Sequence, residues 1–204
     1  FEEKAYLAQS PQFYKQMAMA SGFEKVFMVG PVFRAEPSFT SRHLTEFTGW
    51  DFEISYIDSI EEIMNEEEDL IISGFKKVKE NLGIDIDIPE KPFPKYTMAE
   101  AKEMLKKEGI KETREFDLRA DEELALSEIV KKKDNHNFVF ITDWPVGARP
   151  FYHMRYEDKP KLTKSFDLLY KGLEITTGAQ REHRYNVLVN QAKEKDMDIK
   201  PLEG

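Results

Sequence analysis

The chain has 204 residues, of which 40% are hydrophobic, so it is long enough for one domain with a substantial core. Its 39 acidic and 30 basic residues give a net charge of −9, which excludes a basic tail or nucleic-acid coat but leaves room for a local basic patch. The absence of cysteine excludes disulfides and cysteine-based zinc sites, and no apolar run approaches a membrane span, so we expect a cytoplasmic protein with no membrane partner.

The first quarter of the chain predicts one helix followed by two strands. Ser10 and Pro11 are typical of a helix start, and Gly22 marks its end after about Ser21. The apolar segment 25–34 and the alternating segment 47–57 predict strands. A polar loop joins them, so an antiparallel pair is expected.

The remaining elements mix helices and strands without strict alternation. Ser59 or its neighbour Asp58 is expected to cap a long amphipathic helix to about Asn81, with the acidic run 66–69 as its solvated face. The elements predicted after it are helices at 98–107 and 121–133, strands at 138–141 and 151–155, a hairpin over 165–177 that turns at Lys171-Gly172, and a helix from near Arg181. Such an order predicts an α+β fold with an antiparallel sheet flanked by helices.

Motifs of several common enzyme classes are absent. The ten glycines form neither GxGxxG nor GxxxxGK, so we expect no dinucleotide fingerprint and no phosphate loop of the Walker type. No GxSxG elbow is present, although a dispersed Ser-His-Asp triad stays open. The four histidines lack metal-ligand spacing, and we expect all but His43 to be structural or exposed.

The predicted strand pair carries a charged and aromatic surface. Side chains alternate between the faces of a strand, so the residues sharing faces are Arg34 with Glu36, and Phe47 with Gly49, Asp51 and Glu53. A nucleotide site would use such a set, because arginine binds phosphate in a fork, an aromatic ring stacks on a base, and an acid binds an amine. A solvated face with ordinary salt bridges is an equally good interpretation.

The predicted hairpin carries two carboxylates on one face. If Lys171-Gly172 forms a two-residue turn, Asp167 pairs with Thr176, and Glu174 is its diagonal neighbour about 7–8 Å away. Such a pair can hold a hard divalent cation with water and substrate phosphates. Two exposed acids on a hairpin are the simpler alternative.

The first predicted helix has a polar stripe with aromatic neighbours. The stripe consists of Gln12, Lys15, Gln16 and Met19. Such a stripe is usually solvated, but the flanking Phe13, Tyr14 and Met17 would let it border a pocket.

Several segments resemble motifs of the class II aminoacyl-tRNA synthetases. The letters FRAE at 33–36, RHLTEF at 42–47 and the following Asp51 resemble motif 2 of that family. The segments that resemble its aspartate-specific members of archaeal and eukaryotic type are QSPQFYKQ at 9–16, RPFY at 149–152, SFD at 165–167 and GLEITTGAQR at 172–181. Their order and spacing agree with that group across most of the chain.

The resemblance implies part of a catalytic domain with a six- or seven-stranded antiparallel sheet and a mainly helical insertion around 83–135. It implies that L-aspartate and ATP form aspartyl-adenylate with Mg²⁺, after which the aspartyl group moves to the acceptor end of tRNA. A homodimer is implied for the full-length protein. The anticodon-binding domain, motif 1 and motif 3 are not found, and the chain begins at Phe1. We therefore expect a processed product or a segment of a longer chain that forms little adenylate alone.

The resemblance also implies residue roles. Arg34 is the implied catalytic residue, which would bind the α-phosphate and the substrate carboxyl group. Aspartate would be bound by Ser10, Gln12, Lys15, Arg34, Asp51, Thr177 and Arg181. ATP would be bound by Arg34, Glu36, Arg42, His43, Leu44, Phe47 and Glu174. Mg²⁺ would be held by Asp167 and Glu174, with Thr177 nearby.

Selection of aspartate over asparagine is expected to depend on positive charge. The two amino acids have nearly the same shape, but asparagine would leave the charges of Lys15 and Arg181 unpaired, and unpaired polar sites reject analogues strongly. The alternatives are an asparaginyl enzyme, an ATP-dependent asparagine synthetase of this fold, and a non-catalytic paralogue that binds an amino acid or nucleotide. Charging of asparagine tRNA in addition stays open.

Overall fold

The computed structural model describes residues 3–36, 44–111 and 114–200. The chain forms two compact units, Phe1–Asp58 and Ser59–Gly204, and each is described by itself. Both units combine helices with antiparallel strand pairs, which confirms the predicted α+β class. Within the described residues, no helix combines the length and the apolar character that a membrane span requires.

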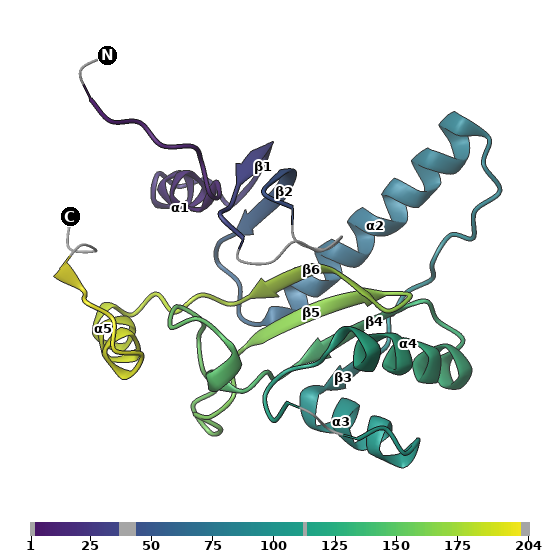
Figure 1. Cartoon of the computed structure of the whole chain (residues 1–204). Coiled ribbons are helices and arrows are strands. Elements are labelled where there is room, and N and C mark those ends of the chain that lie inside the picture. Colours follow the sequence, from purple (N-terminus) through teal and green to yellow (C-terminus); the bar gives the residue numbers. More distant parts are fainter. Residues whose placement is uncertain (1–2, 37–43, 112–113, 201–204) are drawn as a thin grey trace. The chain divides into compact units, whose positions relative to one another are not determined.

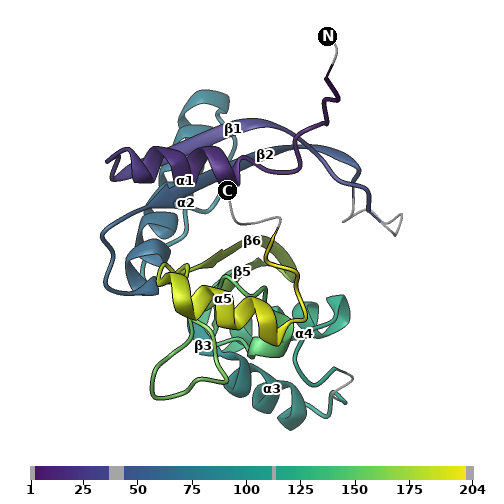
Figure 2. The ribbon, with the colours of Figure 1, turned by 90° about the vertical axis from the view of Figure 1, so that its left-hand side faces the viewer.

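The first unit is a two-stranded antiparallel ribbon with a helix running along it (Figure 2). Its elements are α1 (Gln12–Ala20), β1 (Lys25–Phe33) and β2 (Glu46–Ile54). Phe47 lies opposite Val32, and Asp51 opposite Met28, so the ring and the acid share a face with Glu53. The predicted antiparallel pair and its polar face are confirmed.

The helix α1 begins one residue later than predicted. Pro11, rather than Ser10, occupies the capping position, and the Ser10 hydroxyl accepts a hydrogen bond from the Gln12 backbone N–H at 3.4 Å. The helix ends at Ala20, and Gly22 follows with a φ of 98°. This left-handed conformation favours glycine, which explains the position of the helix end.

The second unit is a four-stranded sheet with α2 on one face and α3 and α4 on the other (Figure 1). The strand order is β3-β4-β5-β6, and the β3–β4 pair is parallel, which the sequence had not predicted. The elements are α2 (Ile60–Leu82), β3 (Lys95–Thr97), α3 (Met98–Lys107), α4 (Ala120–Asp134), β4 (Phe138–Thr142), the 3-10 helix η1 (Val146–Ala148), β5 (Ser165–Tyr170), β6 (Leu173–Ala179) and α5 (Tyr185–Glu194). Whether the helical region around 83–135 is an insertion stays a prediction.

The central strands fill two separate cores. Phe140 and Leu168 pack on the side of α2, whereas Ile141 and Leu169 pack on the side of α3 and α4. Neighbouring side chains of a strand point to opposite faces, so one apolar run serves both cores. Each such fully buried side chain stabilises the fold by about 1.5–3 kcal/mol.

The acidic run of α2 is only partly the solvated face predicted for 66–69: its first and last residues are exposed, but its two central residues are buried. Glu67 and Glu68 are only 2% and 1% exposed. Glu68 accepts a hydrogen bond from the Phe93 backbone N–H at 3.0 Å, and Glu67 accepts one from the Thr176 hydroxyl. Both donors come from distant parts of the chain, so the pattern of charges along the helix does not reveal them.

Two further predictions were wrong. The segment 151–155 forms no strand; within it, His153 and Arg155 make only isolated bridges, to Arg181 and Thr163 respectively. The last helix begins at Tyr185 rather than near Arg181. Isolated bridges supply no continuous ladder of hydrogen bonds, so the aromatic composition of this segment was misleading.

The hairpin of β5 and β6 turns at Lys171-Gly172, as predicted. Both residues have positive φ, 50° and 82°, which is typical of a two-residue hairpin turn. The Gly172 N–H donates to the Ser127 hydroxyl at 2.9 Å, and a Cβ on Gly172 would lie 2.7 Å from the Leu124 Cα. The turn is therefore docked closely on α4, and only glycine fits.

A one-residue bulge changes the pairing of this hairpin. The register shifts between its two halves and leaves Ile175 unpaired. Thr177, and not the predicted Thr176, therefore lies opposite Asp167. Glu174 stays on the face of Asp167 as its diagonal neighbour, so the prediction that the two carboxylates share a face is confirmed.

Gly178 lies opposite Phe166, where there is no room for a side chain. A Cβ on Gly178 would lie 2.3 Å from the Phe166 Cζ, and that ring is 1% exposed. We expect Gly178→Ala to lower the free energy of unfolding by about 1–3 kcal/mol, because the buried ring would have to move. Urea unfolding measures this change. Gly74→Ala, at an open position of α2, is the control, and an equal stability of both variants would contradict the prediction.

Candidate active site

Lys15 lies buried on α1 beside two carboxylates of β2. Its side chain is 4% exposed, and its Nζ lies 3.3 Å from Asp51 Oδ1 and 3.4 Å from Glu53 Oε2. The ammonium also donates to the Phe52 carbonyl at 3.5 Å. A buried ammonium requires such partners.

Gln12 joins the same cluster from the first turn of α1. Its Nε2 donates to Glu53 Oε2 at 3.0 Å. Gln12 and Lys15 are three residues apart on one face of the helix, so both reach the acids of β2. The structure thus brings together Gln12, Lys15 and Asp51, while the exposed Ser10 lies just before the helix.

Arg34 and Phe47 lie together at the end of the ribbon. The guanidinium carbon of Arg34 is 5.3 Å from the centroid of the Phe47 ring, and its Nε donates to the Gln9 carbonyl at 3.5 Å. The Arg34 backbone N–H donates to the Thr45 carbonyl at 2.9 Å, which continues the ribbon beyond the named strands. An exposed guanidinium can bind a phosphate, and the aromatic ring beside it can stack on a base.

The other residues of this unit that were predicted to bind ATP show no such grouping. Glu36 is half-buried after β1, and Leu44 is exposed before β2. Arg42 and His43 lie outside the described residues. Their roles stay predictions.

In the second unit, Asp167 is buried on β5 and paired with Arg149. The Arg149 Nη2 lies 2.6 Å from Asp167 Oδ2, and its Nη1 donates to the Thr177 hydroxyl at 3.4 Å. The guanidinium carbon also lies 4.0 Å from the centroid of the Trp144 ring. Arg149 was not predicted as a site residue, although it stands in one of the segments that carry the family resemblance.

Negative charge accumulates around this pair. Burial raises the pKa of Asp167, and the Arg149 charge opposes that rise. The Glu174 side chain is exposed, but protein atoms surround its carboxylate and partly desolvate it. This desolvation raises the pKa of Glu174 to about 7, and the negative charges of Asp167 and Glu123 add to the rise. On the opposite face of the sheet, burial raises the pKa of Glu67 to about 7. A cation would relieve this repulsion.

The oxygen atoms of Asp167, Glu174 and Thr177 suit a hard divalent cation. Asp167 Oδ1 is buried without a hydrogen-bond partner among the described residues, and a second carboxylate is its cross-strand neighbour. In the part of the chain that the structure describes, no group of three or more acidic or histidine side chains could hold a metal. A cation here would therefore need further oxygen ligands, such as water or phosphate.

Buried polar atoms without a hydrogen-bond partner concentrate near the same strands. Over 3–36, 44–111 and 114–200, these atoms include Arg149 Nε, His153 Nδ1, Asp167 Oδ1 and Gln180 Oε1. His153 bridges to Arg181, and burial, followed by the charges of Arg149 and Arg181, lowers the pKa of His153 to about 3. Such atoms are rare in folded proteins, and their concentration here is typical of a site for a polar ligand.

The sequence had not predicted His153 or Gln180 as site residues. Neither stands in a metal-ligand or catalytic spacing. Gln180 directly precedes Arg181, whose guanidinium carbon is 4.6 Å from the centroid of the Tyr152 ring. The only available signal was the proximity of both residues to the conspicuous segments at 149–152 and 172–181.

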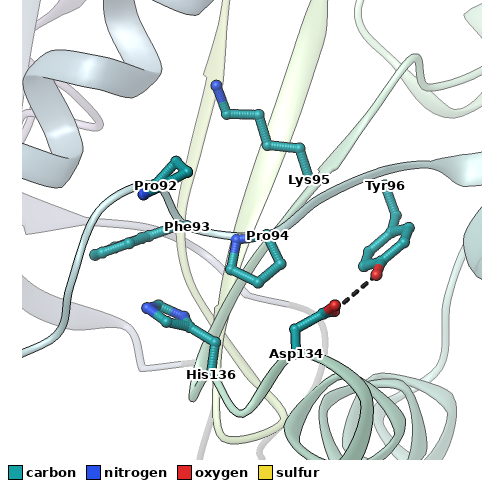
Figure 3. Close-up of a pocket in the computed structure, with 7 residues that line it drawn as sticks. All are labelled: Pro92, Phe93, Pro94, Lys95, Tyr96, Asp134 and His136. Carbon is teal, nitrogen blue, oxygen red and sulfur yellow. Dashed lines mark hydrogen bonds between the residues drawn. The ribbon is translucent and has the colours of Figure 1, made fainter.

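The second unit also contains a cavity of about 510 Å³, whose polar groups, unlike those around Asp167, mostly have protein partners (Figure 3). It is lined by Pro92, Phe93, Pro94, Lys95, Tyr96, Asp134 and His136. The Tyr96 hydroxyl donates to Asp134 at 2.7 Å, and Lys95 pairs with Glu61. Its main polar groups already have protein partners, so the cavity does not compete with the site around Asp167.

A comparison with known families places the whole chain in one of them. The family described as tRNA synthetases class II (D, K and N) matches residues 1–203. The chain belongs to the class II tRNA synthetases. The family resemblance of its motifs is thereby confirmed.

Individual relatives of this class II chain include enzymes for two amino acids. An aspartate–tRNA(Asp) ligase of Pyrococcus abyssi is 43% identical over 210 residues, which cover 100% of this chain and 48% of that protein. An aspartyl-tRNA synthetase from Entamoeba histolytica has a TM-score of 0.90 at 38% identity, over 100% of this chain and 44% of that one. An asparaginyl-tRNA synthetase from Pyrococcus horikoshii, complexed with asparaginyl-adenylate, has a TM-score of 0.86 at 32% identity, over 100% and 49%. The chain spans about half the length of the curated relatives it matches.

Proposed function

We propose that the complete protein is an aspartate–tRNA ligase, which activates L-aspartate with ATP and transfers it to tRNA. The relative that is 43% identical is named for this activity. Because the fold is shared with an asparaginyl enzyme, the choice of amino acid must come from individual side chains. The observation that carries the proposal is the buried ammonium of Lys15 beside two carboxylates.

Lys15 is proposed to select the side-chain carboxylate of aspartate. An ammonium can donate hydrogen bonds but cannot accept them, so it suits a carboxylate and leaves the NH₂ of an asparagine side chain without a partner. A site built around a buried charge rejects an analogue that cannot pair with it. Asp51 is proposed to bind the substrate ammonium, because its carboxylate is 36% exposed beside Lys15 and a carboxylate pairs with an ammonium. Ser10, Gln12, Thr177 and Arg181 are proposed as further aspartate-binding residues.

Arg34 is proposed to bind the α-phosphate of ATP and the α-carboxylate of aspartate. A carboxylate oxygen attacks the α-phosphorus, and the bond between that phosphorus and the bridging oxygen of pyrophosphate breaks. A fixed guanidinium would hold the two anions together and stabilise the charge that develops between them. Phe47 lies beside Arg34 and is proposed to stack on adenine, with Glu36 and Leu44 near the base and Arg42 and His43 near the phosphates.

Asp167 and Glu174, with Thr177, are proposed to hold Mg²⁺. The unpartnered Asp167 oxygen and the raised pKa values of both carboxylates support this assignment. When bound, Mg²⁺ would neutralise phosphate charge. Arg149 orients the Asp167 carboxylate through its contact at 2.6 Å.

Transfer to tRNA needs no protein nucleophile. A hydroxyl at the 3′ end of tRNA attacks the aspartyl carbonyl, and AMP leaves. The sequence contains no GxSxG nucleophile elbow, which agrees with this chemistry. The acceptor end of tRNA, a homodimeric state and a cytoplasmic location remain part of the proposal.

Amino-acid-dependent exchange between ATP and pyrophosphate tests the proposed function in the complete protein. We expect aspartate to support exchange with kcat/KM about 10⁴-fold above that of asparagine, because the site pairs a charge that asparagine lacks. Preference for asparagine would identify an asparaginyl enzyme. Conversion of aspartate to asparagine with ammonia and without tRNA would identify an asparagine synthetase, and binding of substrate without exchange would identify a non-catalytic paralogue.

A further inference from the structure

The bulge in β6 decides which threonine lies beside Asp167. In an unbulged hairpin, Thr176 would face Asp167, and Thr177 would point toward α2. The observed bulge reverses this arrangement: Thr177 lies opposite Asp167, and Thr176 lies opposite Leu168, whose side chain packs on the α2 side. The bulge is thus a requirement for placing the Thr177 hydroxyl beside the carboxylate pair.

A contact on the α2 side matches the bulged arrangement. The Thr176 hydroxyl donates to Glu67 Oε1, and Glu67 is 2% exposed. In the unbulged register, Thr176 would leave the α2 face, and the buried carboxylate would lose this donor. A buried acceptor without a donor is strongly disfavoured, so the contact favours the bulged register.

The two ends of β6 do not by themselves select this arrangement. Gly172 is held by Ser127 of α4, and Gly178 is packed against the Phe166 ring. These contacts fix where the strand starts and ends. Among the described residues between those ends, Thr176 is the one whose side chain donates to α2.

We propose that Glu67 is a positioning residue for the carboxylate pair: through Thr176 it holds the bulge that places Thr177 beside Asp167. The part of this inference that concerns Mg²⁺ rests on the proposed function. The part that concerns the register of the hairpin does not.

Crystal structures and Mg²⁺ titrations of the complete protein test this inference. The variants are Glu67→Leu, which removes the acceptor, Thr176→Val, which removes the donor, and Glu67→Gln, which keeps an acceptor oxygen. Glu68→Leu is the matched control, because Glu68 is equally buried on α2 but accepts its hydrogen bond from the Phe93 backbone N–H and not from β6. Each variant is also assayed for the Mg²⁺ concentration that gives half-maximal aspartate-dependent exchange.

We expect Glu67→Leu and Thr176→Val to lose the pairing of Asp167 with Thr177. The half-saturating Mg²⁺ concentration should rise about tenfold in both, since partners behind metal ligands typically contribute this much to metal affinity. Glu67→Gln should retain the pairing and stay within about twofold of the wild type, because the amide oxygen still accepts from Thr176. Glu68→Leu should also retain the pairing and the Mg²⁺ dependence, even if it unfolds more readily.

Retention of the Asp167–Thr177 pairing in Thr176→Val or Glu67→Leu would overturn the inference. Loss of the pairing with an unchanged Mg²⁺ dependence would overturn its connection to the metal. If Glu67→Leu does not fold, Thr176→Val decides, because valine has nearly the shape of threonine. If the wild type shows no aspartate-dependent exchange, the proposed function fails, and the crystal structures still decide the role of Glu67.

Discussion

Lys15→Leu is expected to abolish aspartate activation in the complete protein and to leave ATP binding in place. The ammonium is the buried cation of its cluster, and leucine cannot pair with a substrate carboxylate. We expect kcat/KM for aspartate in the exchange assay to fall about 10⁴-fold, as for other sites that lose the polar partner of their substrate. Equilibrium dialysis with ATP measures nucleotide binding separately.

The fold should tolerate this change well enough to make the assay meaningful. Asp51 is 36% exposed and Glu53 17% exposed, so water can solvate both carboxylates after the ammonium is removed. Lys4→Leu, at an exposed lysine of the same unit, is the matched control and should retain full activity. Unchanged aspartate-dependent exchange in Lys15→Leu would refute the assignment of this residue.

Elements with strong local signals were predicted closely from the sequence. At the start of α2, the Glu62 carboxylate accepts a hydrogen bond from the Ser59 backbone N–H at 3.2 Å, and Gly83 ends the helix with a φ of 62°. The turn at Lys171-Gly172 is likewise specified by its own two residues, both of which have positive φ. In each case the residues that specify the conformation are neighbours in the chain, so a single sequence contains the necessary information.

Features that depend on distant partners were not predictable in this way. Glu67 and Glu68 occupy positions that read as a charged helix face, but their donors are Thr176 and Phe93. The bulge at Ile175 likewise has no local signal, because a threonine pair fits either register. Tertiary contacts decide both features, and the pattern of polar and apolar residues does not specify them.

The candidate site likewise combines residues that the sequence identifies with residues that only the folded chain reveals. The resemblance selected Lys15 and Asp51 as separate residues, and the structure brings them within 3.3 Å. It did not select Arg149, His153 or Gln180, whose unpartnered buried atoms become visible only once the chain is folded. Burial of a polar atom is a property of its surroundings, so residue type and spacing give no direct measure of it.

Glu174→Gln is expected to lower aspartate-dependent exchange by about 100- to 1,000-fold without destabilising the fold. The variant keeps the shape of the side chain and removes one of the two carboxylates proposed for Mg²⁺. Because Glu174 is exposed and no ion pair involves it among the described residues, its charge is not needed for folding. Exchange measured over a range of Mg²⁺ concentrations, with urea unfolding in parallel, tests both statements.

The Glu174 carboxylate is expected to make the stability of the fold fall as the pH rises. The pKa of Glu174 rises from 4.5 to about 7 on folding, so the folded state binds more protons between these values. Stability contributed by this group is therefore present below about pH 4.5 and is lost as the pH rises through 7. Glutamine does not titrate, so the variant should lack this decline and be at least as stable as the wild type at pH 8.

A matched pair of variants separates the proposed metal role from a structural one. Asp167→Asn should reduce exchange and also destabilise the fold by about 3–5 kcal/mol, because it weakens the buried pair with Arg149. Glu128→Gln, at an exposed acid of α4, should change neither property. If Glu174→Gln keeps wild-type exchange at every Mg²⁺ concentration, the carboxylate pair does not hold the cation. If it instead unfolds as readily as Asp167→Asn, its role is structural, since only a group required for packing would destabilise an exposed position to that degree.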